Sequence, residues 1–244
     1  MLEFKKTAPL AQIGMMHQLS APHWAQLEPG FTTLRECTAG EVISERGQPL
    51  DHSLLLVDGI VGRRIKVGRK QGARHHLVAL QVPGDFVDLH AYPLKVLDHD
   101  IVAITDVQMA VISHERVKSV IDDQPEFTRQ LWSLTLVDAA IHRHWALRNG
   151  TMRALQRVAN LFAELITRMD AGGAAVTSSY ALNLSQPHIG DACGLSGVHI
   201  NRVLRTLREA NCCTYVKGEL VVQDRAALNL IAEFDPDYLY LPGS

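Results

Sequence analysis

The sequence has few cysteines, no long apolar run and no excess of charge of one sign. Its four cysteines include no pair at CxxC spacing, and this usage is typical of a reducing compartment. No apolar stretch approaches the roughly 18 residues that a membrane-spanning helix needs. The N-terminal stretch MLEFKKTAPLAQIGMMHQLS lacks the apolar core of a signal peptide. We therefore expect a cytoplasmic protein that makes no contact with a membrane.

Catalytic and cofactor-binding motifs are missing as well. The sequence contains no GxSxG, P-loop, HExxH or dinucleotide-binding fingerprint, so we predict no enzyme, no catalytic residues, no cofactor and no metal. The net charge of −2 excludes a surface that binds polyanions over its whole area, so any nucleic-acid contact must be a local patch. The length of 244 residues fits one large domain or two small ones.

The first half consists of short segments rich in Val, Ile and Leu, separated by Gly, Pro and Asp. Several of them alternate between apolar and polar residues, as strands with one buried face do. Short strands at this spacing predict a β-sandwich or a small barrel. The expected strand segments are 31–37, 41–47, 53–67, 75–82 and 101–112.

A long helix is expected from about residue 124 to residue 147, where the sequence has no glycine. Two apolar rows on this helix predict two packing partners. One partner is the β domain, and the other is either the C-terminal domain or the same helix of a second chain. The Asn149-Gly150 pair predicts a turn and a domain boundary. One row contains Trp132, Leu136 and Ala139, and the other contains Phe127, Leu131, Leu134, Ile141 and Trp145.

The stretch LSQPHIGDACGLSGVHINRVLRTL predicts two short helices joined by a tight turn. Ser185 is a suitable N-cap for the first helix, Gly194 suits the left-handed position that ends it, and Ser196 caps the second. The following segment, YVKGELVV, predicts a β-hairpin that turns at Lys217-Gly218. This order of elements indicates a winged helix-turn-helix.

The outer face of the second helix is polar and cationic. Val198, Asn201, Arg202 and Arg205 lie on it, with His199 to one side. Arginine and asparagine side chains on such a helix can pair with base edges in the DNA major groove. The alternative is an ordinary helical hairpin with a solvated basic face.

Taken together, these motifs resemble the Crp/Fnr superfamily of bacterial transcription regulators over nearly the whole chain. The resemblance depends on LSQPHIGDACGLSGVHINRVLRTLREA, on the wing GELVVQD, and on VDGIVGRR and PGDFVDLH in the first half. It implies an α+β fold with a cyclic-nucleotide-binding-like β-roll (a double-stranded antiparallel jelly roll) over residues 1–118. The β-roll is followed by a long dimerisation helix over 119–149 and by a winged helix-turn-helix DNA-binding domain over 150–244. It also implies a homodimer on a palindromic operator, with RNA polymerase as a further partner.

The segment PGDFVDLHAYPLKVLDHDIVAI departs from relatives that bind cyclic AMP. Asp88-Leu89 replaces a Gly-Glu pair, and Leu97-Asp98-His99 replaces the arginine that meets the cyclic phosphate. A buried phosphate needs a cation or several N–H donors, and Lys95 is the only cation that we expect near this pocket. We therefore predict a regulator that does not depend on cyclic AMP. The expected effector pocket comprises Gly84, Asp85, Phe86, Asp88, Leu89, Lys95, Asp98 and His99.

In the recognition helix we expect Arg202 to carry most of the sequence readout and Arg205 to hold a phosphate. The dimer helix is expected to use the row that begins at Phe127. The alternatives are a ligand-sensing module whose winged domain contacts protein, a cyclic-AMP-responsive regulator with an atypical pocket, and an enzyme on the β domain. Oxidation of an exposed Cys212 or Cys213 is a further hypothesis. The predicted DNA-binding residues are Ser185, Ser196, Gly197, Val198, His199, Asn201, Arg202, Arg205 and Lys217.

Overall fold

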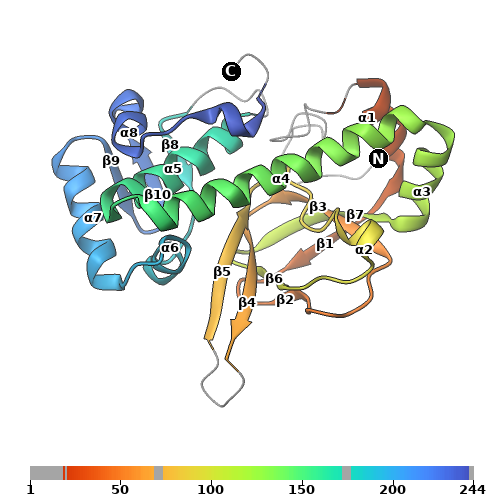
Figure 1. Ribbon diagram of the computed structural model, residues 1–244, viewed down its shortest axis with the longest axis horizontal. Coiled ribbons are helices and arrows are strands. Elements are labelled where there is room, and N and C mark those ends of the chain that lie inside the picture. The colour runs from red at the N-terminus through yellow and green to blue at the C-terminus, as the bar shows by residue number, and fades with distance from the viewer. Residues whose placement is uncertain (1–18, 20, 69–73, 172–176, 242–244) are drawn as a thin grey trace.

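A β-sheet domain and a smaller, mainly helical domain lie side by side, and the long helix α4 (Pro125–Thr151) runs along both (Figure 1). The computed structural model describes residues 19, 21–68, 74–171 and 177–241. The α+β architecture expected from the sequence is confirmed. Within these residues, no helix combines the length and the apolar character needed to cross a bilayer. The stretch searched for a signal peptide lies, apart from Leu19, outside the described residues.

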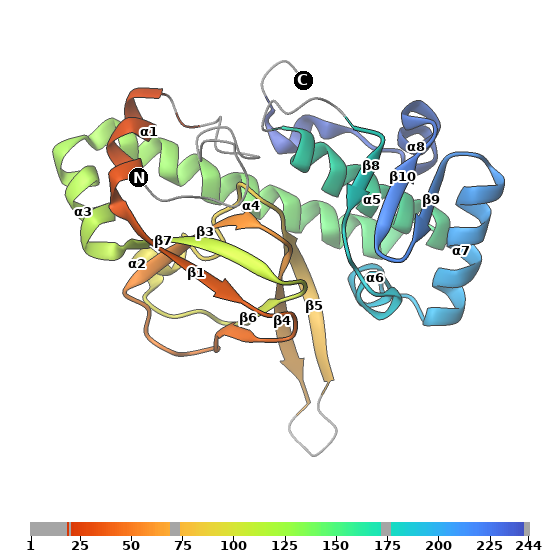
Figure 2. The same ribbon diagram turned by 180° about the vertical axis from the view of Figure 1, so that it is seen from behind.

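The N-terminal domain contains two antiparallel sheets in the described residues, with strand orders β1-β7-β3 and β2-β6-β4-β5 (Figure 2). Two of the predicted segments, 53–67 and 101–112, each form two strands because the chain turns in their middle. The strands are β1 (Phe31–Cys37), β2 (Val42–Ser44), β3 (His52–Asp58), β4 (Val61–Val67), β5 (Arg74–Gln81), β6 (Asp100–Ala103) and β7 (Val107–Ser113).

Strand β3 is buried on both faces and therefore contributes to two hydrophobic clusters. Leu54 and Leu56 lie in a cluster drawn from strands of both sheets. Leu55 and Val57 lie in a second cluster, which also contains Phe127 of α4. Successive side chains of a strand point to opposite faces, so one strand can serve both clusters. Each fully buried leucine stabilises the fold by roughly 1.5–3 kcal/mol.

Short helices flank this domain and lead into α4. They are α1 (Ala21–Leu27), the 3-10 helix η3 (Glu28–Gly30), α2 (Ala91–Leu94) and α3 (His114–Asp123). The hydroxyl of Ser113 caps α3 by accepting a hydrogen bond from the Arg116 N–H at 3.1 Å. Pro125 begins α4, where no N–H is needed for an intrahelical hydrogen bond.

The turn predicted at Asn149-Gly150 is wrong, because both residues lie inside α4. The reason is tertiary packing: the side chain of Asn149 donates to the carbonyl of Ala192 at 3.1 Å, and the preceding residue Arg148 is buried. These contacts hold the last turn of the helix, so the local turn preference is overridden.

The two apolar rows of α4 meet different surroundings. The row assigned to the dimer contact is covered by its own chain, so that assignment does not hold. In the other row, Trp132 is 63% exposed and Leu136 is 51% exposed. The covered row consists of Phe127, Leu131, Ile141 and Trp145, which are buried, and Leu134, which is partly buried.

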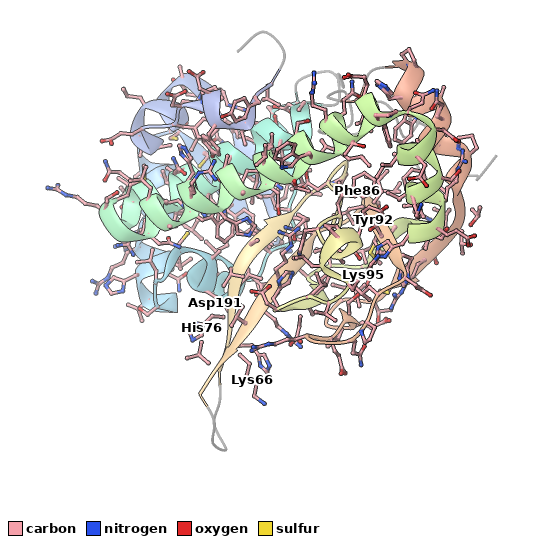
Figure 3. The ribbon with its side chains drawn as sticks, turned by 45° about the vertical axis from the view of Figure 1, so that its right-hand side comes forward. Lys66, His76, Phe86, Tyr92, Lys95 and Asp191 are labelled. Atoms are coloured by element: carbon pink, nitrogen blue, oxygen red, sulfur yellow. The ribbon has the colours of Figure 1, made fainter. Side chains whose placement is uncertain are left out.

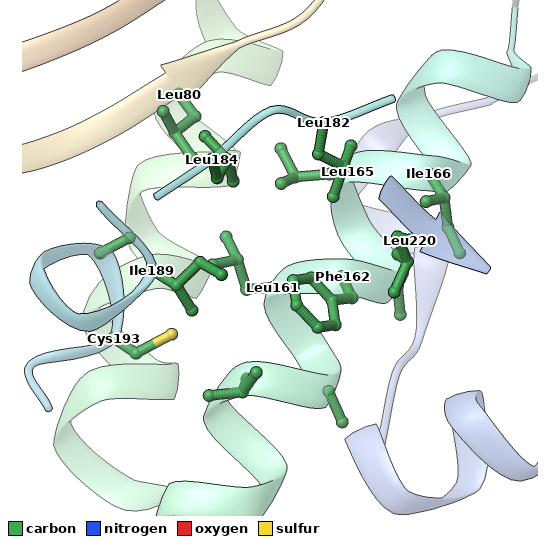
Figure 4. Packing of buried hydrophobic residues seen from close by; sticks show 14 of the residues in the cluster. Leu80, Leu161, Phe162, Leu165, Ile166, Leu182, Leu184, Ile189, Cys193 and Leu220 are labelled. Carbon is green, nitrogen blue, oxygen red and sulfur yellow. The ribbon is translucent and has the colours of Figure 1, made fainter. Parts of the chain in front are cut away.

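The C-terminal domain packs around α5, whose Phe162 and Leu165 lie among buried residues of α6 and the wing (Figure 4). Its small sheet has the strand order β8-β10-β9. The elements are α5 (Ala154–Asp170), β8 (Ser179–Ala181), α6 (Gln186–Cys193), α7 (Gly197–Glu209), β9 (Cys213–Val216), β10 (Glu219–Val222), α8 (Arg225–Ala232) and the 3-10 helix η4 (Pro236–Leu239).

Helix α6 also contacts strand β5 of the N-terminal domain. The carboxylate of Asp191 accepts the backbone N–H of Leu77 at 2.6 Å and lies 3.3 Å from Nδ1 of His76 (Figure 3). Leu80 of β5 belongs to the same hydrophobic cluster as the C-terminal domain. The two domains are therefore joined by packing as well as by α4.

Candidate DNA-binding face and effector cavity

The helix-turn-helix forms where the sequence predicts it, but Ser196 stands at the N-cap position of α7 without the predicted side-chain hydrogen bond to that helix. The Ser185 hydroxyl accepts the His188 N–H at 3.3 Å, and Gly194 ends α6 with a φ of 62°. The Leu195 N–H then donates to the Gly190 carbonyl at 2.7 Å, which closes the turn between the helices. The buried faces contain Ile189, Ala192 and Cys193 from α6, and Ile200, Val203 and Leu207 from α7.

All nine residues predicted to contact DNA are exposed. Val198, Asn201, Arg202 and Arg205 follow helical spacing on α7 and therefore share one face, with Val198 63% exposed. Such a large exposed apolar side chain beside two arginines suits contact with a thymine methyl group. The wing turns at Lys217 and Gly218 as predicted, with φ values of 51° and 86°.

Side chains at the start of each helix support this face. The Ser196 hydroxyl and Nδ1 of His199 lie 2.9 Å apart, which holds the histidine ring against the beginning of α7. The side-chain amide of Gln186 donates to Oδ1 of Asn201 at 2.9 Å. Two of the predicted base-reading side chains are therefore already oriented by neighbours.

Sequence reasoning missed a groove of about 290 Å³ between α7 and the wing. Gln186 and Arg208 line it together with the predicted residues Asn201 and Arg205. Arg208 follows Arg205 by three residues, so helical spacing alone could have predicted that it lies on the same side of α7. The position of Gln186 was not, because it depends on how α6 packs against α7.

The hypothesis of an exposed, oxidisable thiol is wrong for both adjacent cysteines. Cys212 and Cys213 are 0% and 1% exposed. Burial raises the pKa of both thiols, that of Cys213 to about 12, which disfavours the reactive thiolate. Both residues serve the core beneath the wing.

A small cavity of about 40 Å³ lies between the β domain and α4, at the PGDF segment. Four predicted pocket residues, Gly84, Asp85, Phe86 and Leu89, line it. The sequence prediction did not include its other polar residues; His90 directly follows Leu89 in the chain, and the rest come from distant elements that only the fold brings together. Those residues are Arg63 of β4, His90, Thr135 and Asp138 of α4, and Arg168 of α5.

Arg63 is a buried cation, 3% exposed, on the wall of this cavity. Its Nε and Nη2 donate to the Val87 carbonyl at 3.2 and 2.7 Å, and its Nη1 donates to Asp138 at 2.6 Å. Burial opposes ionisation of Asp138, but Arg63 and His142 outweigh it and lower the pKa of this carboxyl. Burial, with Arg63 nearby, lowers the pKa of His90 to about 4, so its ring is neutral at neutral pH.

Arg168 brings a second buried cation to the cavity from the C-terminal domain. It pairs with Asp85 and donates to the Leu80 carbonyl at 3.1 Å. It also pairs with Glu164 at 3.2 Å, and Glu164 is 0% exposed. The sequence prediction that Lys95 is the only cation near the pocket is therefore wrong.

The other four predicted pocket residues lie away from the cavity lining. Lys95 is exposed, with its ammonium group 5.0 Å from the ring centroid of Tyr92 (Figure 3). Asp98 is exposed and contacts the ring of His99 at 2.7 Å. Asp88 is fully buried and faces β3, where its Oδ1 accepts the Leu54 N–H at 2.7 Å.

Asp88→Asn is expected to stabilise the protein increasingly as pH rises. Burial raises the pKa of Asp88 to about 7, so the folded state retains a proton that the unfolded state loses above its ordinary value of 3.8. Stability is therefore lost as pH rises from about 4 to about 7. At about 1.4 kcal/mol per pKa unit, the variant should gain about 2–3 kcal/mol over wild type between pH 5 and pH 8. Urea unfolding of both proteins at pH 5 and pH 8 measures how much more stable the variant is than wild type at each pH. The same gain in free energy of unfolding at both pH values would contradict this expectation.

Comparison with known proteins agrees with this geometry. The model of the Crp-like helix-turn-helix domain matches residues 156–231. The transcriptional activator protein FnrL of Cereibacter sphaeroides is 26% identical over 210 residues, which cover 83% of this chain and 82% of the relative. A probable transcriptional activator of Rhizobium leguminosarum bv. viciae is 28% identical over 136 residues, which cover 56% of this chain and 55% of the relative.

Solved structures show the same fold. FixK2 from Bradyrhizobium japonicum superposes with a TM-score of 0.71 at 22% identity, covering 82% of this chain and 96% of that one. A putative cAMP-binding regulatory protein from Silicibacter pomeroyi superposes with a TM-score of 0.64 at 17% identity, covering 92% and 97%. The likeness therefore extends over both domains and the helix between them.

Proposed function

We propose that this chain, a Crp/Fnr-type transcription regulator with a DNA-binding helix-turn-helix, binds a palindromic operator as a homodimer. The observation that carries the proposal is the exposed row on α7, which combines Val198, Asn201, Arg202 and Arg205 on a helix whose opposite face is buried. Half-sites about 10 base pairs apart would let two such helices enter successive major grooves on one side of the duplex.

Each residue of this face has a role that follows from its chemistry. Arg202 pairs with a guanine edge, and Asn201 or His199 sets the preference at neighbouring bases. Arg205, at the far end of the row, holds a backbone phosphate. The Ser185 and Ser196 hydroxyls, the Gly197 backbone N–H and the Lys217 ammonium group add contacts to the sugar-phosphate backbone.

The homodimer is supported by the exposed row of α4. Trp132, Leu136, Ala139, Arg143 and Ala146 follow one another at alternating spacings of four and three residues, as in a coiled-coil seam. Trp132 and Leu136 are large apolar side chains one helical turn apart, and both are more than half exposed in the single chain. Pairing of this row with its copy would bury them and place two α7 helices symmetrically.

We further propose that the regulator acts without cyclic AMP, that it has no catalytic role, and that RNA polymerase is its partner at promoters. The cavity of about 40 Å³ is far smaller than the roughly 300–1,000 Å³ of small-molecule sites. Its two buried arginines are already paired with carboxylates of the chain. The link to transcription follows from the two relatives named as activators.

Arg202→Ala and Arg205→Ala are expected to weaken DNA binding in different ways. Loss of the base contact of Arg202 should cost about 1–3 kcal/mol on the operator and relax the preference at one position per half-site. Loss of Arg205 should weaken binding to all sequences and reduce the dependence of log K on log salt by about one per protomer. Fluorescence anisotropy on operator and scrambled duplexes at several salt concentrations measures both effects.

Arg46→Ala is the matched control, because Arg46 is exposed in the β domain and belongs neither to α7 nor to the exposed row of α4. It removes the same charge and should leave binding unchanged. If Arg202→Ala preserved the discrimination between operator and scrambled DNA, the assignment of α7 to the major groove would be wrong.

A further inference from the structure

The cavity between the β domain and α4 holds two guanidinium groups, and the chain itself supplies an anion to each. Asp138 of α4 meets Arg63 of β4, and Asp85 of the PGDF segment meets Arg168 of α5. Both arginines are at most 3% exposed, whereas Asp138 is 31% exposed at the side chain. The cavity therefore resembles an anion-binding site in which each cation is already paired with a carboxylate of the chain.

The Arg63 contact is arranged so that Asp138 uses one end of the guanidinium group. Nε and Nη2 of Arg63 both donate to the Val87 carbonyl, which fixes the plane of the group against the β domain. Nη1 is left to face α4 and meets Asp138 at 2.6 Å. An anion at this position would connect the β domain to α4, and in this chain a side chain of α4 does so.

We propose that Asp138 is a built-in substitute for an anionic effector: its carboxylate fills a carboxylate-binding site at Arg63 and docks α4 on the β domain without a ligand. This inference rests on the proposed function, since it concerns how the same regulator is kept competent to bind DNA. Removal of the carboxylate converts the site into one that takes a small free monocarboxylate.

The dimensions of the site select the probe. Asp138→Ala removes one carboxylate group and retains Cβ, so formate has the same three heavy atoms as the group removed. Acetate adds a methyl group, for which the adjoining space of about 40 Å³ offers room. The buried Arg63 would otherwise be left without its anion, so binding of formate to the variant should be favourable.

The test compares melting temperatures of the full chain in sodium formate and in sodium chloride at equal ionic strength. Asp138→Ala should melt several degrees below wild type in chloride and regain at least half of that loss in about 100 mM formate. Wild type should respond equally to the two salts. If the variant unfolds on purification, its refolding yield in formate against chloride replaces the melting temperature.

Two further variants separate the site from a general salt effect. Asp138→Asn fills the same space without the charge and should not respond to formate. Asp100→Ala removes the carboxylate that pairs with Arg64, the residue after Arg63 in β4. The Arg64 side chain is 27% exposed, so water can solvate it, and this variant should not respond to formate either. An Asp138→Ala protein that melts like wild type, or that ignores formate, would overturn the inference.

A DNA-binding arm distinguishes this inference from the proposed function. In chloride, Asp138→Ala should bind the operator at least tenfold more weakly than wild type, and formate should restore it. Equal affinity of wild type and Asp138→Ala for the operator in chloride would show that Asp138 does not control DNA binding, and it would overturn the inference. If wild type itself bound no DNA sequence selectively, the proposed function would fail, while the melting experiment would still decide whether the carboxylate site exists.

Discussion

Glu164→Gln is expected to lower the free energy of unfolding by about 3–5 kcal/mol, the usual cost of removing one partner from a buried ion cluster. Glu164 is 0% exposed and its two oxygens accept four donors. Oε1 accepts from Trp145 at 2.9 Å and Arg168 at 3.2 Å, and Oε2 accepts from Arg148 at 3.3 Å and Tyr238 at 3.0 Å. Glutamine would place an N–H₂ group against two of these donors and leave Arg148 without an anion.

Graded controls make this expectation specific. Tyr238→Phe removes one hydrogen bond to the same charged carboxylate and should cost about 1.5–3 kcal/mol. Glu126→Gln removes an exposed carboxylate, 3.6 Å from Arg129, and should change stability by less than about 0.5 kcal/mol. Urea unfolding at neutral pH measures all three variants. A Glu164→Gln effect no larger than that of Glu126→Gln would contradict the account of the cluster.

The double variant Trp132→Glu with Leu136→Glu is expected to abolish the proposed dimer and to weaken binding to the proposed palindromic operator by about 100-fold or more. The reason is that a dimer binds its second half-site as an intramolecular event, and this gain in avidity is typically 10²–10⁴. Binding to a single half-site should change little, since α7 is untouched. Sedimentation equilibrium and DNA titrations on full and half operators measure the two effects.

Leu230→Glu is the matched control for an added surface charge, because Leu230 of α8 is 80% exposed. It should remain dimeric and bind DNA as wild type does. If the double variant on α4 also remained dimeric, the exposed row of α4 would not be the seam and the dimer would have to form elsewhere.

The helix-turn-helix and its wing could be predicted from the sequence because local chemistry defines them. Ser185 and Gly194 act at the ends of α6 through contacts within a few residues, and the Lys217-Gly218 turn likewise depends on its own backbone. The exposed face of α7 follows from helical spacing alone. The nine residues predicted to contact DNA, which lie on α7, at the helix N-caps and in the wing, are all exposed.

The cavity between the β domain and α4 could be predicted only in part, because its walls come from elements far apart in the sequence. The PGDF segment marked its place, but Arg63 and Arg168 reach it from β4 and α5. Sequence spacing also could not tell which apolar row of α4 its own chain would cover. The same limit explains Cys212 and Cys213, whose burial depends on the packing of the wing on the core.

We propose that two copies of this chain read a palindrome through α7 without an added ligand. The most direct measurement is selection of bound sequences from a random duplex pool by the purified full chain in buffer alone. We expect enrichment of a palindrome with half-sites about 10 base pairs apart, and loss of one selected position per half-site when the selection is repeated with Arg202→Ala. Enrichment of no sequence, or of a single unpaired half-site, would contradict it.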